Sequence, residues 1–447
     1  MREDAPTPIA DVIDVGPITA FQIGAIALSS LAAFLDGLDS QSIAVAAPVI
    51  AENLGLSRSA LGPIFSAGLL GAMIGALGFG PLGDQFGRKR VLVLATLIFG
   101  VFTLATIQAQ SYQYLLGVRF AAGLGLGGAT PCFIALASEY APTRRRAMVA
   151  SLIWAAFPLG GTIGGFLNGF LLAKFGWQAI FGVGGVLPLI VAAALAIWLP
   201  ESLRFLISKG DAQERIRAIV RRMRPELSAA ARYIADEERL TGAPLKHLFN
   251  AGHAADTLLL WIPFFGAFGT LALAVVWTPV LLREHGVAPG EAGIALGIHG
   301  IGALIGMASA GRLMERFGVA TVLVPALLIG AAATASLGYA ASSVSQMSAA
   351  MALVGLSVGM GASGSIALAS LIYPTAVRSS GVGFAMGVGR FGQVLAPLFA
   401  GAVSGAGWSG ARLFLCVALA PFVGAVAIAV ISRRKTDSMP TTAIAAP

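Results

Sequence analysis

Long apolar stretches alternate with short polar connections along most of the 447-residue chain. A helix rises 1.5 Å per residue, so about 20 apolar residues cross the hydrocarbon core of a membrane. Twelve stretches reach that length, and each is predicted to form a membrane-spanning helix: 21–47, 58–83, 91–110, 112–138, 147–173, 177–199, 255–282, 291–311, 319–340, 344–372, 379–403 and 408–431.

One short motif occurs twice, about half a chain apart. The first copy reads GDQFGR at 83–88, the second reads MERFG at 314–318, and Glu315 lies 231 positions after Asp84. Pro142 recurs as Pro374 at an interval of 232 positions. Two unrelated segments agree on nearly one register, which predicts two parallel repeats of six helices. Such repeats are typical of secondary transporters, whose substrate site lies between the two halves.

We therefore predict an all-α integral membrane protein. Its hydrophobic residues make up 57% and its charged residues only 11% of the chain, too few for the surface of a soluble globule of this size. The predicted parts are a tail, a six-helix bundle, a linker, a second six-helix bundle and a second tail: 1–20, 21–199, 200–254, 255–431 and 432–447. Within the linker, helix-like runs at 212–223 and 229–240 are expected on a solvated tether, although its basic residues also suit anionic lipid headgroups or a partner.

The placement of positive charge predicts how the chain crosses the membrane. The net charge is +8, and 23 of the 29 Lys and Arg residues fall on alternate connections and the tails. The positive-inside rule then places both termini in the cytoplasm, and we expect a multi-pass protein of the cytoplasmic (inner) membrane. The same placement argues against nucleic acid as a partner. The first twenty residues carry four acidic residues, unlike the basic start of a cleaved signal peptide.

Asp36 and Asp39 lie three positions apart in the first span, so they share one helix face. Asp36 lies about 22 Å from the cytoplasmic start of its span and Arg119 about 10 Å below the outer surface, depths that coincide. We expect Arg119 to neutralise one or both carboxylates. With two acids against one base, one carboxylate is a candidate proton carrier; the alternative is a structural ion pair between spans one and four.

Arg390 is predicted near the middle of the eleventh span, where a charge is costly. The C-terminal spans offer it no clearly embedded acid, so we expect its guanidinium to bind a substrate carboxylate. Other polar or aromatic side chains within spans are candidates for lining the substrate site, with packing as the alternative for each: Gln41, Trp154, His299 and Gln393.

Charged groups also gather where spans two and four end. Asp84 and Arg88 flank the tight turn at Gly87, and Glu139 closes the fourth span. Acid and base that meet across the interface of the two halves would hold one conformation and release in the other. We therefore predict a gating role for these three side chains.

Several of these segments resemble a known family. The run 80–90 resembles the loop signature between spans two and three of the major facilitator superfamily, and 200–202 resembles the phrase that often ends its sixth span. The segments 36–41, 61–68, 373–378 and 389–392 are similar to those of its aromatic acid:proton symporters, near the hydroxyphenylpropionate and hydroxybenzoate transporters. The resemblance implicates Asp36 and Asp39 in proton coupling and Arg390 in substrate binding. Gln85 departs from the usual basic residue.

The sequence thus predicts a transporter that imports an aromatic carboxylate together with protons by alternating access, with no cofactor and with the proton gradient as its energy source. We expect membrane lipids, protons and the substrate as its partners, and a monomer. Two alternatives are a symporter of a non-aromatic organic acid and an exporter, the latter because 160–165 is glycine-rich. A membrane receptor for an aromatic acid is a third. We expect no enzyme and no metal site, since the sequence holds no phosphate loop, metal cluster or nucleophile constellation.

Overall fold

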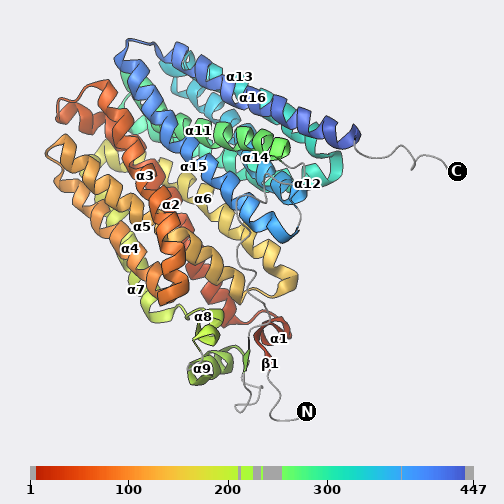
Figure 1. Ribbon diagram of the computed structural model, residues 1–447. Coiled ribbons are helices and arrows are strands. Elements are labelled where there is room, and N and C mark those ends of the chain that lie inside the picture. Colours follow the sequence, from red (N-terminus) through yellow and green to blue (C-terminus); the bar gives the residue numbers. More distant parts are fainter. Residues whose placement is uncertain (1–6, 210–212, 225–232, 235–253, 374, 438–447) are drawn as a thin grey trace. The chain divides into compact units, whose positions relative to one another are not determined.

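The computed structural model describes residues 7–209, 213–224, 233–234, 254–373 and 375–437. Within them, twelve helices are long and apolar enough to cross a membrane, as the hydropathy pattern predicts. They are α2 (Ala20–Asn53), α3 (Leu61–Phe86), α4 (Arg88–Ala105), α5 (Tyr112–Tyr140), α6 (Arg146–Phe175), α7 (Trp177–Trp198), α11 (Ala254–Glu284), α12 (Ala292–Phe317), α13 (Val319–Leu337), α14 (Val344–Ile372), α15 (Thr375–Gly405) and α16 (Gly410–Asp437) (Figure 1).

The contacts of the chain divide it into two compact units. The first holds Met1–Ser42, Ala67–Gly161 and Phe175–Arg239, and the second holds Ile43–Ser66, Thr162–Lys174 and Leu240–Pro447. Three spans are therefore shared, because α2, α3 and α6 each contribute one end to the second unit. The division at 199 and 255 into two six-helix bundles stays a prediction.

Glycines set how closely the helices of each unit approach. A Cβ built at Gly71 or Gly75 of α3 would lie about 2 Å from backbone oxygens of α5. In the second unit, one built at Gly306 of α12 would lie 2.0 Å from the Leu356 carbonyl of α14. Backbone thus packs directly on backbone, as small residues allow inside membranes. In α15, by contrast, Gly383 and Gly387 have no atom of another element within 4 Å.

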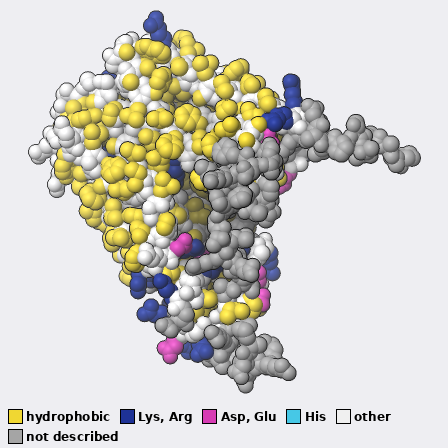
Figure 2. Space-filling model, in the orientation of Figure 1, with side chains coloured by type: hydrophobic (Ala, Val, Ile, Leu, Met, Phe, Trp, Pro, Cys, Tyr) yellow, Lys and Arg dark blue, Asp and Glu magenta, His cyan; other side chains and the backbone are white. Residues whose placement is uncertain are grey.

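Short elements of the N-terminal segment and the linker pack together in the first unit. They are α1 (Ile9–Asp14), α8 (Leu203–Ser208), α9 (Gln213–Met223) and the paired strands β1 (Thr7–Pro8) and β2 (Tyr233–Ile234). The apolar face of α9 joins the core beside α1, with Ile216, Val220 and Val12 all buried. On the face seen in Figure 2, hydrophobic side chains cover the spans, and Lys and Arg side chains gather near α8 and α9.

The described part of the linker forms short elements, and its role as a solvated tether stays a prediction. The helix predicted at 212–223 is present as α9, whose amphipathic pattern buries Ile216, Val220 and Met223 and leaves Arg215, Arg221 and Arg222 exposed. The helix predicted at 229–240 lies mostly outside the described residues. Its two described residues, Tyr233 and Ile234, form a strand with Thr7 and Pro8 instead.

Candidate functional site

Asp39 of α2 and Arg119 of α5 form an ion pair inside the first unit. Nη2 of the arginine lies 2.9 Å from Oδ2, and Nη1 lies 3.5 Å from Oδ1, so the two groups face each other through both oxygens. Asp39 is 3% and Arg119 is 4% exposed. Losing one partner of such a pair would leave a buried charge uncompensated, which typically costs about 3–5 kcal/mol. Asp36, one turn earlier, is half-buried.

Two neighbours of this pair bear on its chemistry: an aromatic ring beside the guanidinium, and a buried side-chain oxygen that lacks a hydrogen-bond donor. The Phe181 ring of α7 lies with its centre 5.7 Å from the Arg119 guanidinium, within the range of a cation–π contact. Gln41, two residues after Asp39, is buried, and its Oε1 accepts no hydrogen bond from any described residue. A buried carbonyl without a donor is costly, so Gln41 is suited to receive a donor from a bound molecule.

A close backbone contact explains why a glycine, Gly37, stands between the two aspartates. A Cβ at this position would lie 1.9 Å from the Phe157 carbonyl oxygen of α6. Reciprocally, one at Gly160 would lie 2.0 Å from the Phe34 carbonyl oxygen. The contact brings the backbones of α2 and α6 together on one side of α2, while Asp39 meets α5 on another.

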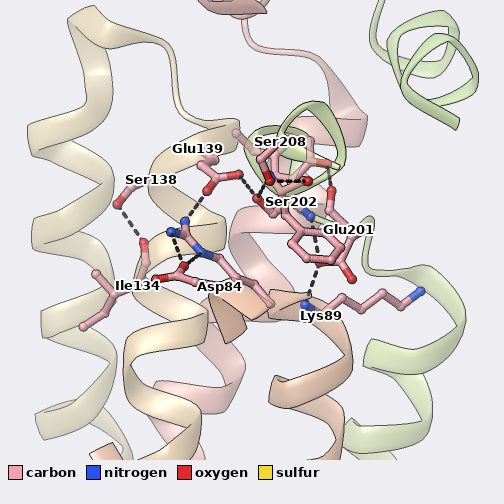
Figure 3. A network of polar contacts seen from close by, with 11 residues as sticks. Asp84, Lys89, Ile134, Ser138, Glu139, Glu201, Ser202 and Ser208 are labelled. Carbon is pink, nitrogen blue, oxygen red and sulfur yellow. Dashed lines mark hydrogen bonds and ion pairs between the residues drawn. The ribbon is translucent and has the colours of Figure 1, made fainter. Parts of the chain in front are cut away.

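A second polar network joins the ends of α3, α4 and α5 (Figure 3). Arg88 donates to Oδ1 of Asp84 from Nη2 at 3.0 Å, and its Nη1 also forms an ion pair with Glu139. Glu139 is buried, and its second oxygen accepts a hydrogen bond of 2.6 Å from the Ser202 hydroxyl. The three residues predicted to have a gating role are thus in contact through Arg88, and all three lie in the first unit. Their expected role across an interface stays a prediction.

Residues after α7 complete this network, a feature that sequence reasoning missed. Oε1 of Glu201 accepts hydrogen bonds of 2.9 Å from the backbone N–H groups of Lys89 and Ser202. The Tyr140 hydroxyl donates to the Glu201 carbonyl at 2.6 Å. Gly87 has φ +105°, and a Cβ there would lie 2.5 Å from Glu201 Oε2. The Pro-Glu-Ser phrase at 200–202 was the available signal, since it follows an apolar span directly.

In the second unit, Arg390 and Gln393 are half-buried in α15. The neighbouring Gly389 lies against Phe268 of α11, and the rings of Phe264 and Phe268 are stacked with centroids 6.0 Å apart. The arginine thus lies on a helix that packs against aromatic side chains.

His299 of α12 is buried in the second unit. Its Nδ1 lies 3.1 Å from the Met351 carbonyl oxygen of α14. Because a carbonyl only accepts, Nδ1 carries the hydrogen, and Nε2 is left as an acceptor. Trp154, in the first unit, is 41% exposed. Gln41 and Trp154 therefore lie in one unit, and Arg390, Gln393 and His299 in the other.

Two more ion pairs lie at the opposite end of the spans from the Arg88 network. Arg283 pairs with Glu52 at 2.8 Å, and Arg58 pairs with Glu284 at 2.7 Å, all within the second unit. The sequence analysis predicts no partner for Arg58 or Arg283. Their acidic partners lie 226 or more positions away in sequence, beyond the reach of a local pattern.

Comparison with known proteins agrees with this architecture. The sequence profile of the Major Facilitator Superfamily matches residues 29–288 and 264–446. The chain belongs to the major facilitator superfamily. Within the superfamily it belongs with the aromatic acid:proton symporters, because its full-length relatives at 32–35% identity are of that family.

Two curated relatives illustrate the family. The 4-hydroxybenzoate transporter of Pseudomonas aeruginosa is 32% identical over 419 residues, covering 93% of this chain and 94% of the relative. The 3-(3-hydroxy-phenyl)propionate transporter of Escherichia coli is 35% identical over 419 residues, covering 93% and 95%. Among solved structures, a bacterial homologue of the human lysosomal transporter Spinster matches with a TM-score of 0.72 at 18% identity, covering 94% and 99%. That match supports the major facilitator fold.

Proposed function

We propose that this protein imports an aromatic carboxylate, of the hydroxybenzoate or phenylpropionate type, together with protons. The observation that carries the proposal is the buried Asp39–Arg119 pair within a superfamily fold whose full-length relatives are named as transporters of such acids. A charge pair in the hydrocarbon depth of a bundle is expensive to keep, and such pairs mark ion and substrate pathways.

Proton coupling is assigned to Asp36, Asp39 and Arg119. Protonating Asp39 removes the charge that holds the Arg119 guanidinium, so the contact between α2 and α5 weakens. The pair is thereby a two-state element that a proton biases, which is what coupling requires. Asp36 lies one turn away on the same helix and is the second candidate carrier.

Substrate binding is assigned to Arg390, with Gln41, Trp154, His299 and Gln393 as candidates for the remaining contacts. A guanidinium matches a carboxylate through two parallel hydrogen bonds. The Phe264–Phe268 stack on the helix next to Arg390 supplies flat apolar surface suited to an aromatic ring. The acceptors at Gln41 Oε1 and His299 Nε2 suit ring hydroxyl groups.

The charge distribution supports an orientation with both termini in the cytoplasm of the inner membrane. The Arg88 network then lies at the cytoplasmic end, and the Glu52–Arg283 pair at the outer end. We assign gating at the cytoplasmic end to Asp84, Arg88 and Glu139, whose contacts join the ends of three spans and the start of the linker.

Transport in membrane vesicles tests the proposal. Right-side-out vesicles are given labelled 4-hydroxybenzoate or 3-phenylpropionate, with and without an imposed inward proton gradient, for the native chain, Asp39→Asn and Arg390→Ala. We expect uptake that follows the gradient in the native chain and is lost in both variants. Uptake indifferent to the gradient would remove the coupling, and uptake intact in Arg390→Ala would remove the assigned anion site. Competition by aliphatic acids equal to that by benzoates would favour a non-aromatic substrate.

A further inference from the structure

The Arg119 guanidinium has more donors than its contact with Asp39 uses. Its two terminal nitrogens face the two oxygens of Asp39 at 2.9 and 3.5 Å. Its Nε is buried and has no hydrogen-bond acceptor among the described residues. The ring of Phe181 supplies a further contact, because the guanidinium carbon lies over this ring, 5.7 Å from its centre. The face of an aromatic ring carries negative potential, so it attracts a cation without being able to take up a proton.

Packing fixes the position of this ring. Phe181 is fully buried, and Trp177, one turn earlier in α7, contacts it edge to face with the ring centroids 6.1 Å apart. Direct backbone contact sets the distance between α7 and α4, since a Cβ at Gly185 would lie 2.9 Å from the Gly100 carbonyl oxygen. The ring is therefore held beside Arg119 by contacts that do not involve the ion pair.

Few other charged groups can face the pair from the surrounding helices. Asp36 lies one turn before Asp39 on α2, and Glu139 lies 20 positions after Arg119 on α5, about 30 Å along the helix. The apolar stretches of the four other N-terminal spans contain no Asp, Glu, Lys, Arg or His: 61–83 of α3, 91–105 of α4, 147–173 of α6 and 177–198 of α7. When Asp39 takes up a proton, Asp36 and the Phe181 ring are thus the two groups in this described part of the chain that can balance the Arg119 cation.

We propose that Phe181 is a positioning residue for proton coupling, whose ring holds the Arg119 guanidinium in place while Asp39 is protonated. The inference rests on the proposed proton-coupled transport and on the role assigned there to Asp39. In the ion pair, the carboxylate of Asp39 sets the position of the guanidinium and the ring adds a weaker attraction. Once a proton removes the charge of Asp39, the cation settles on the ring and remains in line with the carboxyl group. The ring therefore stabilises the protonated state more than the ion-paired state.

A double-variant cycle tests this without measuring transport. Asp39→Asn puts a neutral side chain in place of the protonated carboxyl group, and Phe181→Leu removes the ring. Melting temperatures in detergent are measured for the native chain, the two single variants and the double variant. The apolar packing lost with the ring is the same in both backgrounds, so it cancels. We expect Phe181→Leu to lower the melting temperature by about 2 °C more in the Asp39→Asn background than in the native chain.

An equal fall in the two backgrounds would overturn the proposal, because the ring would then not be what holds the cation when Asp39 is neutral. Where Phe181→Leu does not fold, 3,4,5-trifluorophenylalanine at position 181 takes its place in the cycle. This residue keeps the shape of the ring while the fluorine atoms withdraw negative potential from its face, so it weakens the attraction for a cation and little else.

The same role predicts a change in the pH dependence of uptake. Uptake of 4-hydroxybenzoate into right-side-out vesicles requires the protonated state, so it is lost as the outside pH rises. A ring that attracts the cation less makes the protonated state less stable, and uptake should then be lost at a lower pH. With successively more fluorine atoms on Phe181, we expect the pH of half-maximal uptake to fall stepwise, by about 0.5 unit in total, with the KM at low pH unchanged.

Phe99→Leu is the matched control for both measurements. Phe99 is buried in α4, and no Lys or Arg of the described chain lies over its ring, so its loss should leave the pH of half-maximal uptake unchanged. An unchanged pH across the fluorinated series, or an equal shift in Phe99→Leu, would show that Phe181 only fills space, while the proposed transport stands. Native uptake that is indifferent to the proton gradient would instead remove the proposed coupling, and the role of Phe181 with it.

Discussion

Gly37 of α2 lies so close to Phe157 of α6 that a methyl group on it would come within 1.9 Å of the phenylalanine carbonyl oxygen. We therefore expect Gly37→Ala to push the two helices apart and to lower the stability of the protein by about 1–3 kcal/mol. Gly24→Ala is the matched control, because it lies in the same helix with no atom of another element within 4 Å. Thermal unfolding in detergent measures both, and equal melting temperatures would contradict the assigned close packing.

The buried pair predicts non-additive effects. Asp39→Asn or Arg119→Gln alone leaves one buried charge without its partner, at a cost of about 3–5 kcal/mol. The double variant leaves no net charge, so it should be more stable than either single variant. If Asp39 carries the proton, that recovery of stability will not restore gradient-driven uptake. Melting temperatures and uptake are compared for the three variants. If the loss of stability in the double variant equals the sum of the losses in the two single variants, Asp39 and Arg119 do not stabilise each other.

The two acids bound to Arg88 should differ in importance. Glu139 has 5% and Asp84 has 67% of its side chain exposed. Glu139→Ala leaves the Ser202 hydroxyl and the inner side of Arg88 without their acceptor, and we expect a loss of about 3 kcal/mol. Asp84→Asn breaks a solvated contact between the end of α3 and the start of α4 and should cost at most about 1 kcal/mol. Equal melting temperatures for the two variants would show that the buried contact is not the stabilising one.

The spans were predictable because the membrane sets their length and apolar character. The predicted span 344–372 has the bounds of α14, and 112–138 ends two residues before α5 does. The largest differences are six residues, at the ends of α2, α12 and α16. In α12 and α16 the helix continues through charged residues beyond the apolar stretch, so hydropathy underestimates its length.

The site was predictable only where depth in the membrane constrains it. Counting residues along two spans brought Arg119 to the level of the acidic pair, and the structure places it on Asp39. Counting depth along a span does not constrain residues outside the membrane. The contact between Glu201 and Lys89, which are 112 positions apart, was therefore missed. The joint contribution of α1 and α9 to one hydrophobic core was missed for the same reason, because a short apolar face does not identify what it packs against.

The N-terminal segment is held by Arg224, which follows α9 and is itself buried. Its Nη2 donates to the carbonyl oxygens of Val15 and Pro17, where the chain turns at Gly16 with φ +70°. Hydrogen bonds from a charged donor contribute about 1.5–3 kcal/mol, so Arg224→Gln should release this segment from α9. Arg222→Gln, on the exposed side of the same helix, is the control. Limited proteolysis of an N-terminally tagged protein measures the release: we expect faster loss of the tag in Arg224→Gln than in Arg222→Gln, and equal rates would mean that the segment is held by its apolar contacts alone.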